Sequence, residues 1–437
     1  MHSPADLPYL RTSTRLGGKE QHAQIFDVKF YPYTDPDEDA VFAAVGAADV
    51  FICRPSLDPE QSYEVLRWFR DVNKEASLNS LVWSQDPTTG DPLVCVGGAN
   101  SSRIDVLNVV TGGVARAIRG HGASINDLAV SPLSSAILAS GSADHTIRLW
   151  NLDPAYEKQP CAAIFGGGGH RDIVLAISFH SNGRYLLSGG QDTMVNLWSV
   201  PQCPDANTGT DKPTTVYYPH FSSTEVHHGY IDCVKFHGDL ILSRCSKDQT
   251  DGQDEKEQAK NYILLWKIDG FSSDDPTPDR PPVPAPGVHT RSAFGKRFQR
   301  LLTFDMPYTS QFYIRFSLFD APGHRPILAM GNLRTRMFFW DLQSLEEAQE
   351  GYDEVTAGSK RTGGKRGGRD VSASNRSAMS SERKVDIGDA YAAIEAHKII
   401  SSPSNSTGRN NRKDPATDRS RGVIVGNGAW LPATAPW

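Results

Sequence analysis

Two neighbouring segments of the chain, residues 120–152 and 169–200, nearly superimpose. Each begins with Gly-His, continues through two alternating stretches to Ser-Gly, and then reaches an aspartate six residues before a tryptophan. The two tryptophans, Trp150 and Trp198, are 48 residues apart. Alternation of apolar and polar residues is typical of half-buried β-strands. A unit of this length cannot bury its apolar face alone, so the repeat predicts an array of stacked units.

The period, the Gly-His start and the tryptophan end match the WD40 signature, in which each repeat supplies one four-stranded blade of a β-propeller. The sequence therefore predicts an all-β fold. In such repeats a histidine, a serine, an aspartate and the tryptophan form a buried hydrogen-bonded chain, because a buried carboxylate needs partners. The expected members are His121, Ser140, Asp144 and Trp150 in one copy and His170, Ser188, Asp192 and Trp198 in the other. They look like Ser/His/Asp triads, but we expect them to be structural and predict no catalytic residue.

Weaker copies of the repeat flank these two, which gives six recognisable blades within residues 1–345. The first begins at Ile25, the second surrounds Trp83, the fifth runs from His227 to Trp266, and the sixth spans residues 312–342. A Pro-rich stretch, residues 272–297, is expected to form a loop between blades five and six.

The region after residue 345 departs from this pattern. Residues 346–389 are poor in apolar side chains, and eight Lys and Arg residues lie between Lys360 and Lys384. A solvated, disordered insert is expected, with weak nucleic-acid contact as the alternative. Residues 390–437 supply at most a rudimentary or truncated seventh blade. A strand from residues 7–17 is the candidate for closing the ring, since closure removes an open sheet edge.

The overall composition narrows the class of protein. A formal net charge of -6 and a pI of about 6.1 argue against wrapping duplex DNA with the whole surface. The six cysteines are scattered without a Cys-x-x-Cys pair, so we expect a reduced, intracellular protein with no metal site. No secretory signal and no apolar run of roughly 20 residues is present, so no membrane partner is expected.

Several phrases are not general WD40 consensus. They are Tyr-Ile-Asp-Cys-Val-Lys at 230–235, Gly-Asp-Leu-Ile-Leu-Ser at 238–243 and Tyr-Ile-Arg-Phe-Ser at 313–317. With the stretch around Gly166 to Gly169, they resemble the embryonic ectoderm development / Extra sex combs family, in the family's own order and over residues 22–345. These proteins are the propeller subunit of Polycomb repressive complex 2. The resemblance implies seven blades, the seventh being incomplete or closed by the N-terminal strand.

The resemblance also implies a methyl-lysine site, in which aromatic side chains surround the alkylated ammonium through cation–π attraction. Phe26 falls on the family's cage phenylalanine, and Phe312 and Tyr313 fall on its Trp-Tyr pair. The fourth wall, a tyrosine in the family, is replaced by Asn79, which weakens the cage. Arg315 is a candidate for the peptide rim, and a surface salt bridge is the alternative for it.

Each aromatic residue also has a structural interpretation. Phe26 alternates with Val28 and Phe30, which favours a core position equally. Phe312 and Tyr313 are adjacent, so on a strand they would point to opposite faces.

Taken with the resemblance, these residues predict a non-catalytic nuclear scaffold that promotes gene silencing. Its expected partners are a SET-domain histone methyltransferase, other Polycomb subunits and the histone H3 tail, read at trimethyl-lysine. No cofactor is expected, because Gly166 to Gly169 lacks the Lys-Ser/Thr of a phosphate-binding loop. The alternative is a generic WD40 adaptor of another complex, such as a ubiquitin-ligase substrate receptor.

Overall fold

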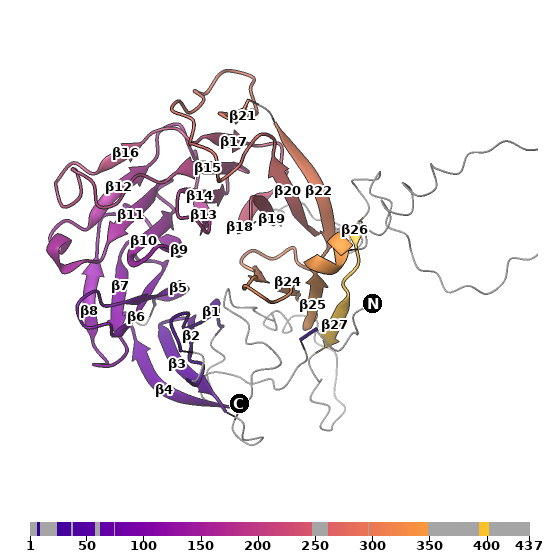
Figure 1. Cartoon of the computed structure of the whole chain (residues 1–437). Coiled ribbons are helices and arrows are strands. Elements are labelled where there is room, and N and C mark those ends of the chain that lie inside the picture. Colours follow the sequence, from indigo (N-terminus) through magenta and orange to yellow (C-terminus); the bar gives the residue numbers. More distant parts are fainter. Residues whose placement is uncertain are drawn as a thin grey trace, which may run out of the picture.

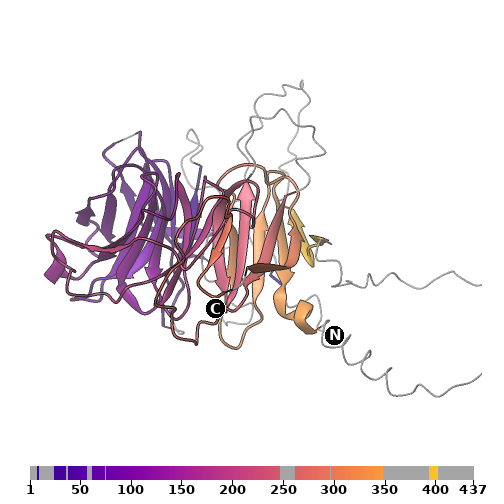
Figure 2. The same ribbon diagram turned by 90° about the horizontal axis from the view of Figure 1, so that it is seen from above.

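Six β-sheets arranged around a common centre make up almost all of the described structure (Figure 1). The computed structural model describes residues 7–8, 24–35, 38–56, 62–73, 75–246, 261–295, 297–347 and 393–401. The sheets stand side by side and form a disc, which Figure 2 shows edge-on. The chain is therefore an all-β propeller, with six blades among the described residues. Within these ranges, no helix is both long and apolar enough to cross a membrane.

The first three blades follow the chain in order, and four consecutive strands of each form an antiparallel meander. Blade one contains β1 (Asp27–Phe30), β2 (Phe42–Gly46), β3 (Asp49–Pro55) and β4 (Tyr63–Arg70). Blade two contains β5 (Ser77–Gln85), β6 (Pro92–Ala99), β7 (Ile104–Asn108) and β8 (Val114–Ile118). Blade three contains β9 (Ile125–Ser131), β10 (Ser134–Ser142), β11 (Ile147–Asn151), β12 (Cys161–Phe165) and, from further along the chain, β16 (Thr214–Val216).

The other three blades continue around the ring. Blade four contains β13 (Val174–Phe179), β14 (Tyr185–Gly190), β15 (Val195–Ser199), β17 (Phe221–Ser223) and β21 (Thr290–Ser292). Blade five contains β18 (Tyr230–His237), β19 (Leu240–Ser246), β20 (Tyr262–Ile268), β22 (Phe298–Asp305) and β26 (Ala393–Ile394). Blade six contains β23 (Phe316–Phe319), β24 (Ile327–Gly331), β25 (Arg336–Asp341) and β27 (Lys398–Ser401). In Figure 1 the first strand of blades one to five lies nearest the centre.

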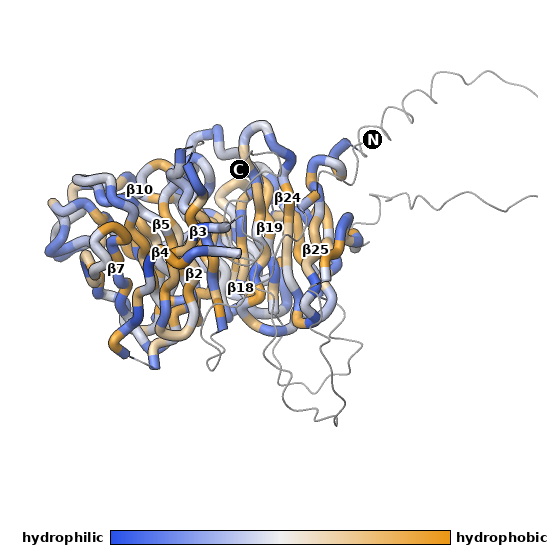
Figure 3. Tube along the Cα trace, turned by 90° about the horizontal axis from the view of Figure 1, so that it is seen from below, coloured by the Kyte–Doolittle hydropathy of each residue, from blue (hydrophilic) through white to orange (hydrophobic). Residues whose placement is uncertain are grey.

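Apolar side chains of neighbouring blades pack against each other. In Figure 3 the apolar residues concentrate in the strands and the polar residues in the loops. One cluster joins Val82 and Cys95 of blade two to Ile125 and Trp150 of blade three. Glycines let the blades approach closely: a Cβ on Gly141 would lie 2.9 Å from the Val174 side chain of the next blade. Burial of these faces between blades is the main stabilising contribution.

The hydrogen-bonded chains expected from the repeat are present in blades three and four. In blade three, His121 Nδ1 donates to Asp144 at 2.8 Å, and Ser140 donates to His121 Nε2 at 2.7 Å. Trp150 Nε1 in turn donates to Ser140 at 2.7 Å. In blade four, His170 lies 3.1 Å from Asp192 and 2.7 Å from Ser188. Trp198 donates to Ser188 at 2.9 Å.

Burial affects the pKa values of the histidine and the aspartate in the hydrogen-bonded chain of blade three. It lowers the pKa of the His121 imidazole, although Asp144 opposes that shift. Burial by itself would raise the pKa of Asp144, but hydrogen bonds from His121, Thr146 and the Gly122 N–H bring it below its ordinary value. A similar chain exists in blade five, where His227 lies 2.7 Å from Ser243 and Trp266 donates to Ser243 at 2.9 Å.

In blades three, four and five, the outermost strand is supplied by a loop of the next blade in the chain. We call these strands, β16, β21 and β26, the lap strands. Along the chain, β16 comes between β15 and β17 of blade four, yet it pairs in parallel with β12 of blade three. β21 lies between β20 and β22 of blade five and pairs with β17 of blade four. β26 lies between β25 and β27 of blade six and pairs in parallel with β22 of blade five.

This arrangement changes two boundaries that the sequence predicted. The Pro-rich stretch 272–297 lies inside blade five, between its third and fourth strands, and not between blades five and six. Residues 398–401, which the sequence assigned to a seventh blade, pair with β25 and complete blade six. Ala393–Ile394, also assigned to the seventh blade, pair with blade five. Residues 390–392 and 402–437 of the predicted seventh blade and nearly all of the basic insert 346–389 lie outside the described residues.

Candidate functional site

Phe312 and Tyr313 lie in a turn that precedes β23, not in a strand. Tyr313 has a φ of 66°, the left-handed region that costs a non-glycine residue on the order of 1–3 kcal/mol. In this turn the two rings contact each other, with centroids 4.3 Å apart and an edge-to-face angle of 70°. The expectation that they point to opposite faces is therefore wrong, because strand geometry does not apply here.

Phe26 meets this pair from the other end of the chain. It lies one residue before β1, and its ring centroid is 6.3 Å from that of Tyr313 at an angle of 71°. The three aromatic residues together form one cluster, which we call the aromatic site. Phe312 is 37% exposed, whereas Phe26 and Tyr313 are half-buried. The aromatic site therefore has one exposed ring, that of Phe312, and two more enclosed rings.

A β-bulge occurs at the same place in the innermost strand of four successive blades. In β5, Leu78 pairs with Gly98 and Ser80 with Gly97, so Asn79 is left without a ladder partner. The same irregularity leaves Asn126 in β9, Leu175 in β13 and Asp232 in β18 unpaired in the ladder. Bulges redirect side chains and are common beside functional sites. Here they direct polar groups from several blades toward Tyr313.

The Tyr313 hydroxyl lies between two of these bulge residues. Asn79 Nδ2 donates to the Tyr313 oxygen at 3.2 Å, and the Tyr313 hydroxyl donates to Asn126 Oδ1 at 3.2 Å. Both asparagines are buried. Burial also raises the pKa of the Tyr313 phenol, so it stays a neutral donor. The position that the sequence predicts as a missing aromatic wall thus holds a side chain that orients Tyr313.

The backbone of the Tyr313 turn is held by blade five. Asp232 Oδ2 accepts the Tyr313 N–H at 3.1 Å, which compensates part of the strain of the positive φ. Arg244 lies 2.5 Å from the same carboxylate and donates to the carbonyls of Thr309 and Gln311. Asp232 and Arg244 are fully buried. Burial raises the pKa of Asp232, although Arg244 opposes the shift.

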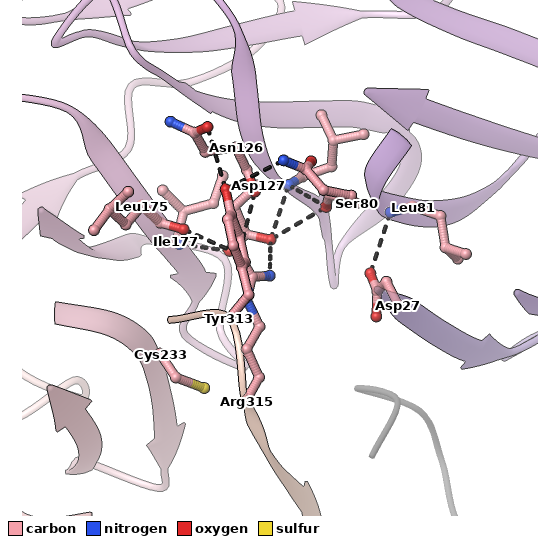
Figure 4. A network of polar contacts seen from close by, with 12 residues as sticks. Asp27, Ser80, Leu81, Asn126, Asp127, Leu175, Ile177, Cys233, Tyr313 and Arg315 are labelled. Carbon is pink, nitrogen blue, oxygen red and sulfur yellow. Dashed lines mark hydrogen bonds and ion pairs between the residues drawn. The ribbon is translucent and has the colours of Figure 1, made fainter. Parts of the chain in front are cut away.

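Arg315 lies inside the molecule, only 5% exposed, and does not line an open rim, contrary to the prediction from the sequence. Its guanidinium is 2.7 Å from Asp127 Oδ1 and donates to the carbonyls of Asn126 and Leu175 (Figure 4). It also lies 5.2 Å from the centre of the Tyr313 ring, within cation–π range. Arg315 therefore supports Tyr313 from within the ring of blades.

Asp127 links four blades through this network. It accepts the Ile177 N–H of blade four at 2.8 Å and the Ser80 hydroxyl of blade two at 3.3 Å, besides the Arg315 contact. Burial opposes ionisation of Asp127, but Arg315, Lys29 and the Ile177 N–H hold its pKa below the ordinary value. A small hollow borders the network and is lined in part by Asp127, Asp232 and Arg315.

The buried carboxylates near the aromatic site are therefore already paired with basic side chains: Asp27 with Lys29, Asp127 with Arg315 and Asp232 with Arg244. The groups that remain to hold a cationic ligand are aromatic faces, which attract alkylated ammonium ions. Among the described residues, no group of three or more His, Cys, Asp or Glu side chains is placed to hold a metal ion.

Sequence reasoning missed Asn126, Asp127, Asp232 and Arg244. The available sign was a polar residue at the same offset in otherwise apolar innermost strands: Asn79, Asn126 and Asp232. Buried polar residues need partners. Recognising those partners requires knowing which blades face each other across the centre.

Comparison with known proteins places the chain in a family. The WD domain, G-beta repeat model matches residues 112–151 and 160–199. A Polycomb group protein FIE2 of Zea mays is 30% identical over 70% of this chain and 72% of its own length. The chain belongs to the embryonic ectoderm development / Extra sex combs family of Polycomb WD40 proteins. It is also 42% identical to the Polycomb protein EED of Chaetomium thermophilum over 80% of the chain, spanning 65% of that protein's length.

Solved structures agree with this membership. The propeller chain in a structure of Chaetomium thermophilum PRC2 in complex with H3K27me3 and H3K27M superposes with a TM-score of 0.76 at 36% identity. The match covers 91% of this chain and 92% of that one. A Polycomb protein esc of Drosophila melanogaster is 29% identical over 74% of the chain. These relatives are Polycomb proteins, and they do not favour the alternative of a ubiquitin-ligase adaptor.

Proposed function

We propose that this chain is a non-catalytic Polycomb subunit that binds a methylated lysine of the histone H3 tail at the aromatic site and supports a SET-domain methyltransferase. In this role it would act in the nucleus and promote gene silencing. The observation that carries the proposal is the meeting of Phe26 and Tyr313, which come from opposite ends of the propeller sequence. Family membership and the PRC2 structures that the chain resembles support the same role.

The chemistry of the aromatic site suits such a ligand. A methylated ammonium is poorly hydrated, so it loses little on leaving water, and aromatic faces hold it by cation–π attraction worth about 0.5–2 kcal/mol per favourable contact. The nearby carboxylates of Asp127 and Asp232 are paired with Arg315 and Arg244. A hydrated, unmethylated ammonium would find no free carboxylate among these groups and would bind more weakly.

Titration calorimetry with the H3K27me3 peptide and its unmethylated form tests the proposal. The protein should be assembled with its methyltransferase before the two peptides are compared. Phe26→Ala is expected to weaken binding of the methylated peptide about 5- to 30-fold, which corresponds to roughly 1–2 kcal/mol. Trp68→Ala, at a 57% exposed aromatic residue on β4, is the matched control and should leave the affinity unchanged. Equal binding of both peptide forms would refute the reading role.

The scaffold role has a separate test. Co-purification with a SET-domain methyltransferase should survive Phe26→Ala, because that residue belongs to the aromatic site and not to the outer surface. Failure of the unaltered chain to co-purify would refute the scaffold role.

The seven-bladed ring that the family implies is part of the proposal. Leu7 packs against a cluster formed by Ile327, Ala329 and Phe339 of blade six. Its carbonyl accepts a hydrogen bond from Lys398 Nζ of β27 at 3.3 Å. These contacts support a closing role for the N-terminal segment beside blade six. An exposed edge strand would otherwise invite pairing with other chains.

A further inference from the structure

The direction of each hydrogen bond around Tyr313 is determined by the group at the end of the series. The Val174 carbonyl can only accept, so Asn126 directs its Nδ2 toward it, at 2.9 Å. Asn126 Oδ1 must then accept, and the Tyr313 hydroxyl donates to it. Since the single Tyr313 proton is used, its oxygen accepts from Asn79 Nδ2. The orientation of the Asn79 amide follows from these three bonds.

Asn79 Oδ1 is therefore left as an acceptor. It is buried and has no hydrogen-bond partner among the described residues, on a side chain that is 5% exposed overall. Oδ1 and Nδ2 belong to one small planar carboxamide, and Nδ2 lies 3.2 Å from the Tyr313 hydroxyl oxygen, so Oδ1 lies close to that end of Tyr313. Leaving a buried acceptor unsatisfied is unfavourable, which makes it a site for a donor that arrives with a ligand.

We propose that Asn79 determines the methylation state that the aromatic site prefers, and that its Oδ1 accepts the N–H of a dimethylated lysine. The inference rests on the proposed function and specifies its ligand: dimethyl-lysine in preference to trimethyl-lysine. The β-bulge at Asn79 is what directs this side chain toward Tyr313.

The number of N–H groups on the ligand decides the preference. A trimethylammonium carries none and gains only from aromatic surface. A dimethylammonium carries one, which must lose its water on entry and is matched by the one acceptor at Asn79. A monomethylammonium carries two, so one would stay unmatched while a methyl group is also lost. A buried polar group selects strongly for the ligand that pairs with it.

The test is titration calorimetry of one H3 tail peptide, the one trimethylated in H3K27me3, in its unmethylated, dimethylated and trimethylated forms. The chain is again assembled with its methyltransferase. The unaltered protein should bind the dimethylated peptide about 3- to 10-fold more tightly than the trimethylated one, the range expected for one neutral hydrogen bond. Tighter binding of the trimethylated peptide to the unaltered protein would overturn the inference.

Two variants separate the acceptor from the aromatic wall. Asn79→Leu has similar size and no acceptor, so the preference for the dimethylated peptide should disappear. Asn79→Tyr adds an aromatic wall and should favour the trimethylated peptide. Phe26→Ala should weaken both methylated peptides alike, because it removes a wall without touching the acceptor. A ratio of affinities that is the same in Asn79→Leu and in the unaltered protein would contradict the role of Asn79.

The outcomes also separate this inference from the proposed function. If no methylated peptide binds more tightly than the unmethylated one, the proposed function fails. If both methylated peptides bind but the trimethylated one is preferred, only the role of Asn79 fails. Thermal unfolding of each variant shows whether its binding was measured on folded protein.

Discussion

Ser188 illustrates how one small side chain supports a whole blade. Its hydroxyl accepts from Trp198 at 2.9 Å and lies 2.7 Å from His170 Nε2, and the residue is fully buried. Removing the hydroxyl leaves both partners unsatisfied. Buried groups without partners cost about 1–3 kcal/mol.

Ser188→Ala is therefore expected to lower the free energy of unfolding by about 1–3 kcal/mol, measured by urea denaturation. Ser181→Ala, at an exposed position in the preceding turn, is the control and should stay within about 0.5 kcal/mol of the unaltered protein. If the two variants were equally stable, the buried chain would not contribute to the fold as described.

The buried His227 is expected to make the stability of the protein depend on pH. Burial, with Arg300 and His228 adding to it, lowers the pKa of His227 to about 3 in the folded protein, against an ordinary value of 6.5. Between these values the unfolded chain binds a proton that the folded chain does not. Stability from this group is complete above pH 6.5 and is lost as the pH falls toward 3.

The free energy of unfolding should therefore fall as the pH is lowered from 6.5 toward 3, with up to about 1.4 kcal/mol per pH unit contributed by His227. In His227→Gln this part of the slope should disappear, whereas the control His324→Gln, at an exposed histidine of blade six, should keep it. A His227→Gln slope identical to that of the unaltered chain would contradict this assignment.

At the scale of elements, the lap strands tie blades four, five and six each to the blade before it. Gly166 N–H donates to the Val216 carbonyl at 3.1 Å, and Gly168 N–H donates to the Tyr217 carbonyl at 2.9 Å. These bonds connect the end of β12 in blade three to a connection that belongs to blade four. They should protect both glycine amides from exchange with solvent.

Replacing Thr214–Val216 with three glycines should displace β16 and speed hydrogen exchange at Gly166 and Gly168 by about 10-fold or more. Gln191 N–H, which donates to Ile173 within blade four at 2.8 Å, is the internal control and should keep its rate. Unchanged exchange at the two glycines would show that β16 does not hold the edge of blade three.

The lap strands could not be predicted from the sequence. Strand β16 has three residues and β26 has two, too few to show an alternating pattern. The central strands were predictable because Trp150 and Trp198 recur with their aspartates at constant spacing. A pairing between β26 and β22, distant in the chain, follows from tertiary packing and leaves no local pattern.

At the scale of the whole molecule, Asp127 and Arg315 connect blades two, three and four to the start of blade six, which is far away in the sequence. Asp127 contacts groups of blades two and four, and Arg315 approaches it from the segment that begins blade six. The aromatic site depends on this centre, because Arg315 also packs beside Tyr313. The family resemblance located Phe26, Phe312 and Tyr313, but only the closed arrangement of blades shows what positions them.

A double-mutant cycle tests this link. Arg315→Met should reduce the free energy of unfolding by about 3–5 kcal/mol, since it leaves the Asp127 carboxylate buried and unpaired. Asp127→Asn combined with Arg315→Met should cost less than the sum of the single changes. Arg54→Met, which breaks an exposed ion pair with Glu64, is the control and should cost less than about 1 kcal/mol. Additive losses at Asp127 and Arg315 would refute the coupling.

The role of the aromatic site is tested by an experimental structure of the chain, assembled with its methyltransferase, bound to a methylated H3 peptide. We expect the methylated nitrogen to lie within about 6 Å of the ring centres of Phe26, Phe312 and Tyr313, the distance at which cation–π attraction acts. A peptide bound elsewhere on the propeller, with these three rings unoccupied, would contradict it.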